Sequence, residues 1–292
     1  MHSKSQRIAI FGGSGLLGAR LIDRMNFLGY EVLSPSSQKI NLFNLNLLTQ
    51  FIAETKPNTI INLVALTDVD SCENFPQEAY LKNAKTVQNI FIAIRNANIN
   101  THVVHISTDH LYDSIDESNE EVICLRNYYA YSKYLGELMV DPAITTILRT
   151  NFFGKSHTPG RSSFTDWLYD SLTLEQKINV YEDVLFSPLS ISTLIKMIIL
   201  VNDKKLPGIF NLGSKNGFSK ADFAFKFASL VEPSFNNMVR SKLSDHSLGK
   251  DSNRPKNMLM NSGKFEKVYE VRLPQLCDEI ELVMKEDYEQ RP

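Results

Sequence analysis

Two patterns of hydrophobic positions take turns along the first half of the chain. Short runs of consecutive apolar residues are followed by stretches in which apolar residues recur at helical spacing. These apolar runs predict buried strands at residues 8–11, 31–33, 59–64, 102–106 and 144–148. Helical spacing predicts one helix that starts at Leu16 and ends by Gly29, and others at residues 47–53, 76–97 and 127–140. Alternating strands and helices form parallel sheets with right-handed crossovers. The pattern therefore predicts an α/β fold with a doubly wound parallel sheet.

The pattern loosens beyond Arg149, where we expect a smaller lobe. Helices are predicted at residues 164–174, 190–201 and 274–285, strands at 178–181 and 208–212, and loops at 154–163 and 240–256. The aromatic residues around one further helix are interpreted as core packing: Phe218, Phe223, Phe225 and Phe227. We expect residues 1–151, with a return near 186–213, to form the first domain, and residues 152–292 to form a smaller C-terminal α/β lobe.

Three glycines, Gly12, Gly15 and Gly18, follow the first predicted strand in the spacing GxxGxxG. A strand that turns directly into a helix needs backbone angles that favour glycine, and a pyrophosphate must come close to the free N–H groups at the start of the helix. The same spacing occurs in glycine-rich turns of other α/β proteins. Its position between an apolar strand and a helix favours a Rossmann-type dinucleotide-binding domain.

The end of the second predicted strand bears on the choice of cofactor. An acidic side chain at this place usually holds the ribose 2′-hydroxyl of NAD, and none is present here. Ser34, Ser36, Ser37 and Lys39 offer hydroxyls and one cation, which suit a 2′-phosphate. The sequence therefore favours NADPH, while the alternative of a solvated turn leaves NADH open.

Composition excludes several classes of partner. The chain has 292 residues, of which 43% are hydrophobic and 22% charged, and its net charge of −2 gives no basic excess for binding nucleic acid. The longest apolar segment, residues 194–201, is too short to span a membrane, and the stretch MHSKSQR lacks the apolar core of a signal peptide. Cys72, Cys124 and Cys277 lack the spacing of metal ligands. We therefore expect a cytoplasmic protein with reduced cysteines.

The candidate chemistry lies at the edge of the predicted sheet. Tyr129 and Lys133 are four residues apart and share a helix face, so the ammonium can lower the pKa of the phenol. Thr108, at the end of the preceding strand, can donate a hydrogen bond to a carbonyl oxygen. Taken singly, the pair could face water and the threonine could cap a turn. Their position on the same edge as the glycines favours a common site.

Several motifs resemble a known superfamily. GGSGLLG, STD at residues 107–109 and YAYSK at residues 129–133 are similar to the extended short-chain dehydrogenase/reductases. The stretches at residues 61–73, 103–113, 147–154, 208–213 and 254–265 resemble the dTDP-4-dehydrorhamnose reductase family over nearly the whole chain. This resemblance implies nicotinamide-dependent reduction of the 4-keto group of a 6-deoxy sugar carried on a nucleoside diphosphate.

The resemblance also implies residue roles. Tyr129 would protonate the developing alkoxide, Lys133 would bind the nicotinamide ribose, and Thr108 would hydrogen-bond the substrate oxygen. The implied cofactor residues are Gly12, Ser14, Gly15, Leu16, Leu17, Gly18, Ser34, Asn41, Leu42, Val64, Ala65, Thr67, Tyr129 and Lys133. The implied substrate residues are Thr108, His110, Phe152 and Arg254.

Some positions depart from the family pattern. Asn41 and Leu42 stand where an aspartate and an apolar residue are common, so the contact near the adenine is expected to be neutral. His110 replaces a usual tyrosine and Leu66 a polar or aromatic residue, which leaves the identity of the sugar open. Arg20 replaces a glutamate that binds magnesium between subunits in some members. We therefore predict no metal and not that form of dimer, and leave another homodimer open.

Two other hypotheses stay open. A nucleotide-sugar epimerase on the same fold would recycle a tightly held cofactor, whereas a dehydratase is disfavoured because His110 replaces a carboxylate. The second hypothesis is a non-catalytic regulatory subunit, like that of methionine adenosyltransferase. Since a binding protein has no need of Thr108, Tyr129 and Lys133, their presence favours an enzyme.

Overall fold

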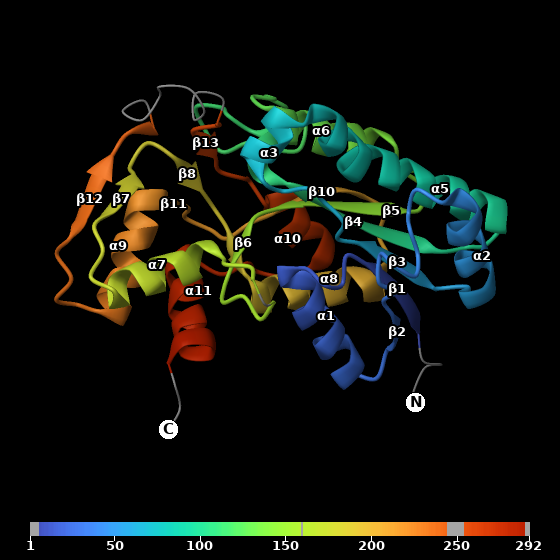
Figure 1. The fold of residues 1–292 in the computed structure, drawn as a ribbon, viewed down its shortest axis with the longest axis horizontal. Coiled ribbons are helices and arrows are strands. Elements are labelled where there is room, and N and C mark those ends of the chain that lie inside the picture. Colours follow the sequence, from blue (N-terminus) through green and yellow to red (C-terminus); the bar gives the residue numbers. More distant parts are fainter. Residues whose placement is uncertain (1–5, 159, 244–253, 290–292) are drawn as a thin grey trace. The chain divides into compact units, whose positions relative to one another are not determined.

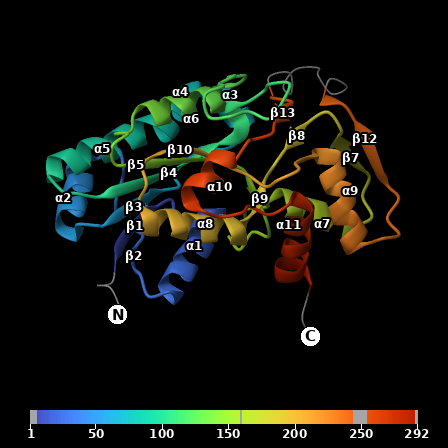
Figure 2. The ribbon, with the colours of Figure 1, turned by 180° about the vertical axis from the view of Figure 1, so that it is seen from behind.

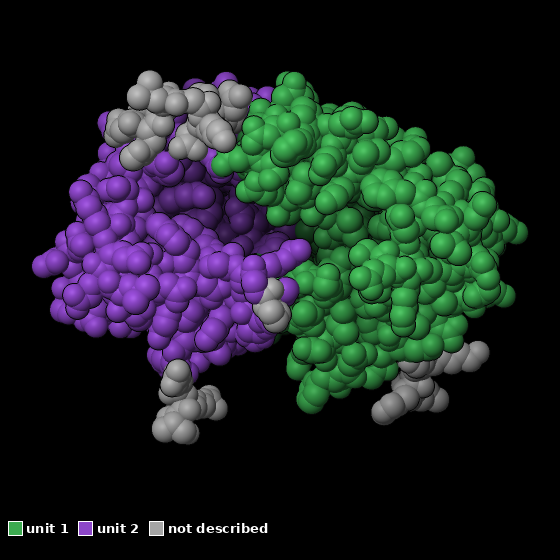
Figure 3. Space-filling view, viewed as in Figure 1, with its two compact units in different colours: residues 1–108, 127–149, 195–210 green, residues 109–126, 150–194, 211–292 purple. Residues whose placement is uncertain are grey.

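The computed structural model of the chain describes residues 6–158, 160–243 and 254–289. It divides into two compact units, coloured green and purple in Figure 3. Unit 1 comprises residues 1–108, 127–149 and 195–210, and unit 2 comprises residues 109–126, 150–194 and 211–292. The expected division into a cofactor domain ending at residue 151 and a substrate lobe stays a prediction.

A six-stranded sheet organises unit 1. Its strands are β1 (Arg7–Phe11), β2 (Glu31–Leu33), β3 (Thr59–Asn62), β4 (His102–Thr108), β5 (Thr145–Thr150) and β10 (Gly208–Leu212). Their order is β10-β5-β4-β3-β1-β2, and β1 pairs in parallel with both β2 and β3. The chain therefore winds outward from β1 in both directions, as predicted, and the strand predicted at residues 208–212 does join this sheet. The reversal of direction beside β1 is where such sheets bind ligands.

Helices cover both faces of this sheet (Figures 1 and 2). On one face lie α2 (Leu45–Thr55), α5 (Thr86–Ala97) and α6 (Tyr128–Leu138), and on the other α1 (Leu16–Phe27) and α8 (Ile191–Lys204). The single helix predicted at residues 76–97 is a succession of α4 (Pro76–Tyr80), a π-helical turn (Leu81–Lys85) and α5. The short α3 (Val69–Asn74) precedes it. π-Turns inside helices often mark functional sites, and this one bears on the candidate site below.

Unit 2 is built from three small sheets and short helices. The sheets are β11-β8-β13, β12-β7 and β6-β9. The strands are β6 (Phe152–Phe153), β7 (Ile178–Tyr181), β8 (Leu185–Phe186), β9 (Leu189–Ser190), β11 (Phe218–Ser219), β12 (Met238–Ser241) and β13 (Asn257–Met258). The helical segments are a 3-10 turn (Asp109–Leu111), α7 (Phe164–Thr173), α9 (Lys220–Val231), α10 (Gly263–Tyr269), α11 (Leu276–Val283) and a π-turn (Met284–Tyr288). Because these strands and helices are short, side-chain contacts hold much of unit 2 together.

Two expectations for unit 2 need correction. Phe223 and Phe227 lie in its buried core, but Phe225 is 38% exposed and lies under the guanidinium of Arg240, 4.9 Å from the ring centroid. Phe225 points away from the core because it sits on the outer face of α9. The segment predicted as a loop at 240–256 begins inside β12, because residues 238–241 pair with β7, and its residues 244–253 lie outside the described residues. No helix in the described part of the chain is long and apolar enough to cross a membrane.

Candidate active site

The glycine-rich turn joins β1 to α1 as its spacing predicts. Gly12 has φ +86°, and a Cβ on this residue would lie 2.9 Å from the backbone of Leu63 and Val64. A Cβ on Gly18 would lie 2.5 Å from the carbonyl oxygen of Gly12. Gly15 is the N-cap of α1, so the first helical N–H groups follow it directly. The turn thus lies tightly against the end of β3 and can bring these N–H groups to a pyrophosphate, which fits a dinucleotide.

Several other predicted cofactor residues make hydrogen bonds within the protein itself. The Ser34 hydroxyl donates to the carbonyl oxygen of Ile10 at 3.1 Å. Asn41 Oδ1 accepts from the N–H of Phe43 at 2.9 Å, and buried Leu42 accepts from Asn89 Nδ2 at 2.8 Å. In this geometry Ser34 shapes the turn, whereas Thr67 lies exposed beyond the end of β3. Their contacts with a cofactor stay predictions.

Thr108, Tyr129 and Lys133 all belong to unit 1 and are buried. They are 3%, 8% and 2% exposed respectively. Asn127 caps the start of α6, because its Oδ1 accepts from the N–H of Ala130 at 2.8 Å, so Tyr129 lies in the first turn of this helix. Lys133 Nζ donates to the carbonyl oxygen of Ile106 at 2.6 Å. This bond ties α6 to β4 two residues before Thr108, so the structure excludes the alternative in which the Tyr–Lys pair faces water.

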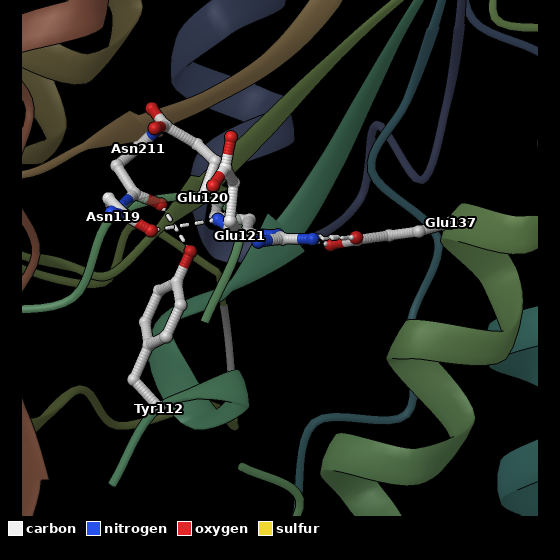
Figure 4. Close-up of polar contacts among 7 residues, drawn as sticks. Tyr112, Asn119, Glu120, Glu121, Glu137 and Asn211 are labelled. Carbon is white, nitrogen blue, oxygen red and sulfur yellow. Dashed lines mark hydrogen bonds and ion pairs between the residues drawn. The ribbon is translucent and has the colours of Figure 1, made fainter. Parts of the chain in front are cut away.

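The charge of Lys133 is set by burial and by a carboxylate one turn further along α6. Burial lowers the pKa of Lys133 to about 8, and Glu137 opposes this shift. Glu137 in turn makes a bidentate ion pair with Arg149: Oε2 is 2.6 Å from one terminal guanidinium nitrogen and Oε1 is 3.0 Å from Nε. Figure 4 shows the side chain of Glu137 extending from its helix. Both side chains are 2% exposed, so the pair is shielded from water.

Sequence analysis missed this ion pair. A glutamate four residues after Lys133 was a readable signal, because it must share the buried face of the helix. Arg149 gave no local signal, since it stands in a strand that is otherwise suited to the core.

The π-turn contributes a second brace beside Tyr129. Asn83 accepts from the N–H of Leu66 at 2.7 Å and donates to the carbonyl oxygen of Leu66 at 2.9 Å. Its Nδ2 also donates to Ser132 Oγ at 2.8 Å, and Ser132 donates to the carbonyl oxygen of Tyr129 at 2.9 Å. Leu66 packs on the cluster that contains Tyr129. The segment that follows β3 is therefore fixed to the helix that carries the phenol.

The remaining predicted substrate residues lie in unit 2. His110 is in the 3-10 turn, Phe152 pairs with Leu189 between β6 and β9, and Arg254 precedes β13. Burial and the positive charges of Lys220 and Arg254 lower the pKa of His110 to about 3, so its ring is neutral at neutral pH. Asp109, adjoining Thr108 in the chain, is buried and accepts from Asn151 Nδ2 at 2.7 Å. Neither Asp109 nor Lys220 was among the candidate site residues predicted from the sequence.

A buried network fixes the acidic loop that follows the 3-10 turn. Fully buried Tyr112 donates from its hydroxyl to Asn211 Oδ1 at 2.5 Å, and Figure 4 shows its ring directed at Asn211. The Asn211 side chain donates to the carbonyl oxygen of Ser118 at 2.8 Å, and its backbone N–H donates to Glu120 at 2.9 Å. The described residues contain no group of three or more His, Cys, Asp or Glu side chains placed to hold a metal ion.

Comparison with known proteins identifies the family. A model described as the RmlD substrate binding domain matches residues 6–289. The chain belongs to this family. The dTDP-4-dehydrorhamnose reductase of Sinorhizobium fredii is 25% identical over 281 residues, covering 92% of this chain and 93% of that protein. The spore coat polysaccharide biosynthesis protein SpsK of Bacillus subtilis is also 25% identical, over 75% of this chain and 77% of its own.

The solved structures share the fold. A crystal structure of dTDP-4-dehydrorhamnose reductase from Bacillus anthracis, in complex with NADP, superposes with a TM-score of 0.87 at 24% identity. It covers 97% of this chain, which covers 99% of that one. A dTDP-4-dehydrorhamnose reductase from Clostridium acetobutylicum gives a TM-score of 0.85 at 24% identity. The expected family and the expected Rossmann-type α/β fold are thus confirmed, whereas the roles of single residues in this RmlD-family chain stay predictions.

Proposed function

We propose that this chain is an NADPH-dependent reductase of a nucleotide sugar, with a 4-keto-6-deoxy sugar on a nucleoside diphosphate as substrate. The observation that carries the proposal is the buried Lys133, which is hydrogen-bonded to the end of β4 and stands one helical turn from Tyr129. The glycine turn of the same unit suits a dinucleotide. Relatives named dTDP-4-dehydrorhamnose reductase, one of them in complex with NADP, support the reaction class and the cofactor.

The bound nicotinamide cofactor supplies the hydride that reduces the ketone carbon. Tyr129 donates its phenolic proton to the oxygen of that carbonyl, so the product is an alcohol. Lys133 stabilises the resulting phenolate because its ammonium is held nearby in a place shielded from water. Thr108 donates a hydrogen bond to the same oxygen and so stabilises its developing charge. Ser36, Ser37 and Lys39 favour NADPH over NADH. Their hydroxyls and the one cation can bind a 2′-phosphate, and no carboxylate is present there to hold a 2′-hydroxyl instead.

Replacement of Tyr129 by Phe tests this mechanism. We expect the turnover of a dTDP-4-keto-6-deoxy sugar, followed by NADPH absorbance, to fall by about 100-fold or more, because the proton donor is lost. NADPH binding, followed by fluorescence, should change little. Tyr131→Phe is the matched control, because Tyr131 lies on the same helix but is half exposed. Unchanged turnover in Tyr129→Phe would contradict the mechanism.

The same assay separates the other hypotheses. An epimerase would retain its cofactor and convert a nucleotide sugar without net oxidation of NADPH. A regulatory subunit would oxidise no NADPH on any nucleotide sugar and would copurify with a partner enzyme in fixed ratio.

A cytoplasmic location is supported by the three cysteines, none of which forms a disulfide. A homodimer stays an expectation.

A further inference from the structure

One row of side chains crosses three neighbouring strands of the unit 1 sheet near their carboxyl ends. Phe11 of β1 pairs with Asn62 of β3, and Asn62 pairs with His105 of β4. Asn62 and His105 are each 1% exposed. The glycine turn begins at the residue after Phe11, and Thr108 stands three residues after His105. The row therefore lies at the edge of the sheet from which the candidate site is built.

Asn62 fixes the chain where it leaves β3. Its Oδ1 accepts from the N–H of Val64 at 3.2 Å, as in an Asx-turn, and the N–H of Leu63 donates to the carbonyl oxygen of Phe11 at 2.9 Å. The carbonyl carbon and the nitrogen of the peptide that joins Leu63 to Val64 both lie 2.9 Å from the place that a Cβ on Gly12 would occupy. Asn62 thus sets the direction of the peptide group against which the glycine turn packs, and Val64 is itself one of the predicted cofactor residues.

The amide of Asn62 has one possible orientation in this arrangement. Its oxygen must face the N–H of Val64, because an amide nitrogen cannot accept a hydrogen bond. Asn62 Nδ2 therefore faces His105 and lies 3.2 Å from Nδ1 of that ring. Burial, and after it the charge of Lys133, lower the pKa of His105, so the ring is neutral at neutral pH. Since Nδ2 donates, Nδ1 is the acceptor and the one ring proton of His105 is on Nε2.

The contact with Asn62 is what the histidine adds to the sheet. Nε2 of His105 is buried and has no hydrogen-bond partner among the described residues. In the described part of the chain, the bond from Asn62 to Nδ1 is therefore the one hydrogen bond of this side chain. An apolar side chain could fill the same place between the sheet and its helices. It could not supply the acceptor that holds the Asn62 amide.

We propose that His105 is a positioning residue for the nicotinamide cofactor, because through the Asn62 amide it fixes the peptide between Leu63 and Val64 against the glycine turn. This inference deepens the proposed function and rests on it for the identity of the ligand as NADPH. Loss of the acceptor weakens NADPH binding, since the peptide must then be ordered when the cofactor binds. Turnover at saturating NADPH changes little, because the candidate proton donor and its lysine are held by other contacts.

Two variants of His105 separate the acceptor from the bulk of the side chain. His105→Asn places an amide oxygen close to the position of Nδ1, whereas His105→Gln carries its amide further out, near the position of Nε2. We expect the dissociation constant of NADPH, measured by fluorescence, to rise about 10-fold in His105→Gln and to stay within about 3-fold of the parent in His105→Asn. An unchanged affinity in His105→Gln would overturn the proposal, as would equal losses in the two variants.

A second variant tests whether His105 acts through Asn62. In a protein that already carries Asn62→Ala, the change His105→Gln should have no further effect on the affinity for NADPH, whereas additive losses would overturn the proposal. His102→Gln is the matched control, because His102 lies on the same strand and is also buried but bonds Thr146. Its NADPH affinity should equal that of the parent. A loss as large as that in His105→Gln would show that the effect does not depend on Nδ1.

The tautomer of His105 gives a test that needs no variant. Nitrogen NMR of the histidine rings of the parent protein at neutral pH should show a neutral His105 ring with its proton on Nε2. A proton on Nδ1, or a charged ring, would overturn the proposal even if the variants failed to fold.

The binding assay separates this inference from the proposed function, since it needs no turnover. NADPH binding that depends on Nδ1 of His105, without oxidation of NADPH on any nucleotide sugar, would leave the positioning role standing and refute the reductase. NADPH oxidation with the same KM for NADPH in His105→Gln and in the parent would leave the reductase standing and refute the positioning role. A protein that binds no NADPH would refute both.

Discussion

Two lysines whose pKa values are lowered by burial, one in each unit, have different contacts. Lys133 of unit 1 donates to a backbone carbonyl at 2.6 Å and has the Glu137 carboxylate one turn away. Lys220 of unit 2 lies over two aromatic rings, and it is influenced by the negative charge of Asp109 and by the positive charge of Arg254. The protein itself balances and orients the first charge, as a group that acts on a neighbouring phenol requires. The second charge lies against aromatic faces, which attract a cation without neutralising it.

The difference extends to the buried acids of the two units. Glu137 of unit 1 is balanced by the guanidinium of Arg149. Glu279 of unit 2 is also buried, but its hydrogen bonds with the described residues come from neutral donors, the N–H of Ser190 at 2.5 Å and the hydroxyl of Thr193 at 2.8 Å. Unit 1 therefore holds a buried ion pair whose glutamate lies on the same helix as Tyr129 and Lys133. Unit 2 uses its acid to fix a helix start.

The largest expected effect on stability breaks the charge pair. Glu137→Gln removes the negative charge that balances Arg149 and should lower the free energy of unfolding by about 3–5 kcal/mol, because a buried charge is left uncompensated. Urea unfolding followed by circular dichroism measures the loss.

Glu279→Gln is the comparison from unit 2. It keeps a carbonyl acceptor and unbalances no charge, so we expect a smaller loss of about 1–3 kcal/mol. A loss in Glu279→Gln as large as that in Glu137→Gln would show that the difference between the two acids does not lie in charge pairing.

The sequence predicted unit 1 better than unit 2, for physical reasons. β1, the glycine turn and α1 are consecutive, so their periods and the angles that glycine allows are all local signals. The strands of β11-β8-β13 have two residues each and pair across long separations, as Phe186 does with Phe218. Two residues carry no period, so this sheet was missed, and with it the proximity of Lys220 to Arg254.

The candidate site divides in the same way. Tyr129 and Lys133 are readable because a helix brings positions four apart to one face. Glu137 follows the same rule and was readable too. Lys220 resembles an ordinary first residue of a helix after the cap Ser219, so nothing local marked it. Only the sheet pairing and the two rings distinguish it.

An effect of intermediate size is expected on how the free energy of unfolding depends on pH. The folded-state pKa values of His102 in unit 1, about 4, and His110 in unit 2, about 3, are lowered mainly by burial. In the unfolded chain these rings bind protons near pH 6.5, so below that pH the unfolded state binds more protons and stability falls. The loss continues as the pH falls towards the folded-state values.

Urea unfolding at several pH values between 7 and 4 measures this slope. His110→Gln and His102→Gln should each reduce it by up to one proton, about 1.4 kcal/mol per pH unit. Lys220→Met should raise the pKa of His110, observed by NMR titration of the ring, and leave that of His102 unchanged, because Lys220 lowers the pKa of His110 and Lys205 that of His102. A slope unaffected by either histidine variant would contradict the assignment.

The smallest effects are expected where the two units should not differ at all. Glu31 pairs with Arg7 in unit 1 and Arg240 pairs with Asp222 in unit 2, both at 2.7 Å, but all four side chains are well exposed to water. Water and salt screen such pairs, so Glu31→Gln and Arg240→Gln should each change the free energy of unfolding by about 1 kcal/mol or less. Thermal unfolding of both variants at low and high salt measures this. A markedly larger loss for Arg240→Gln would mean that unit 2 depends on its charges even at the surface, and that the contrast between Lys133 and Lys220 reflects the unit as a whole rather than burial at the two sites.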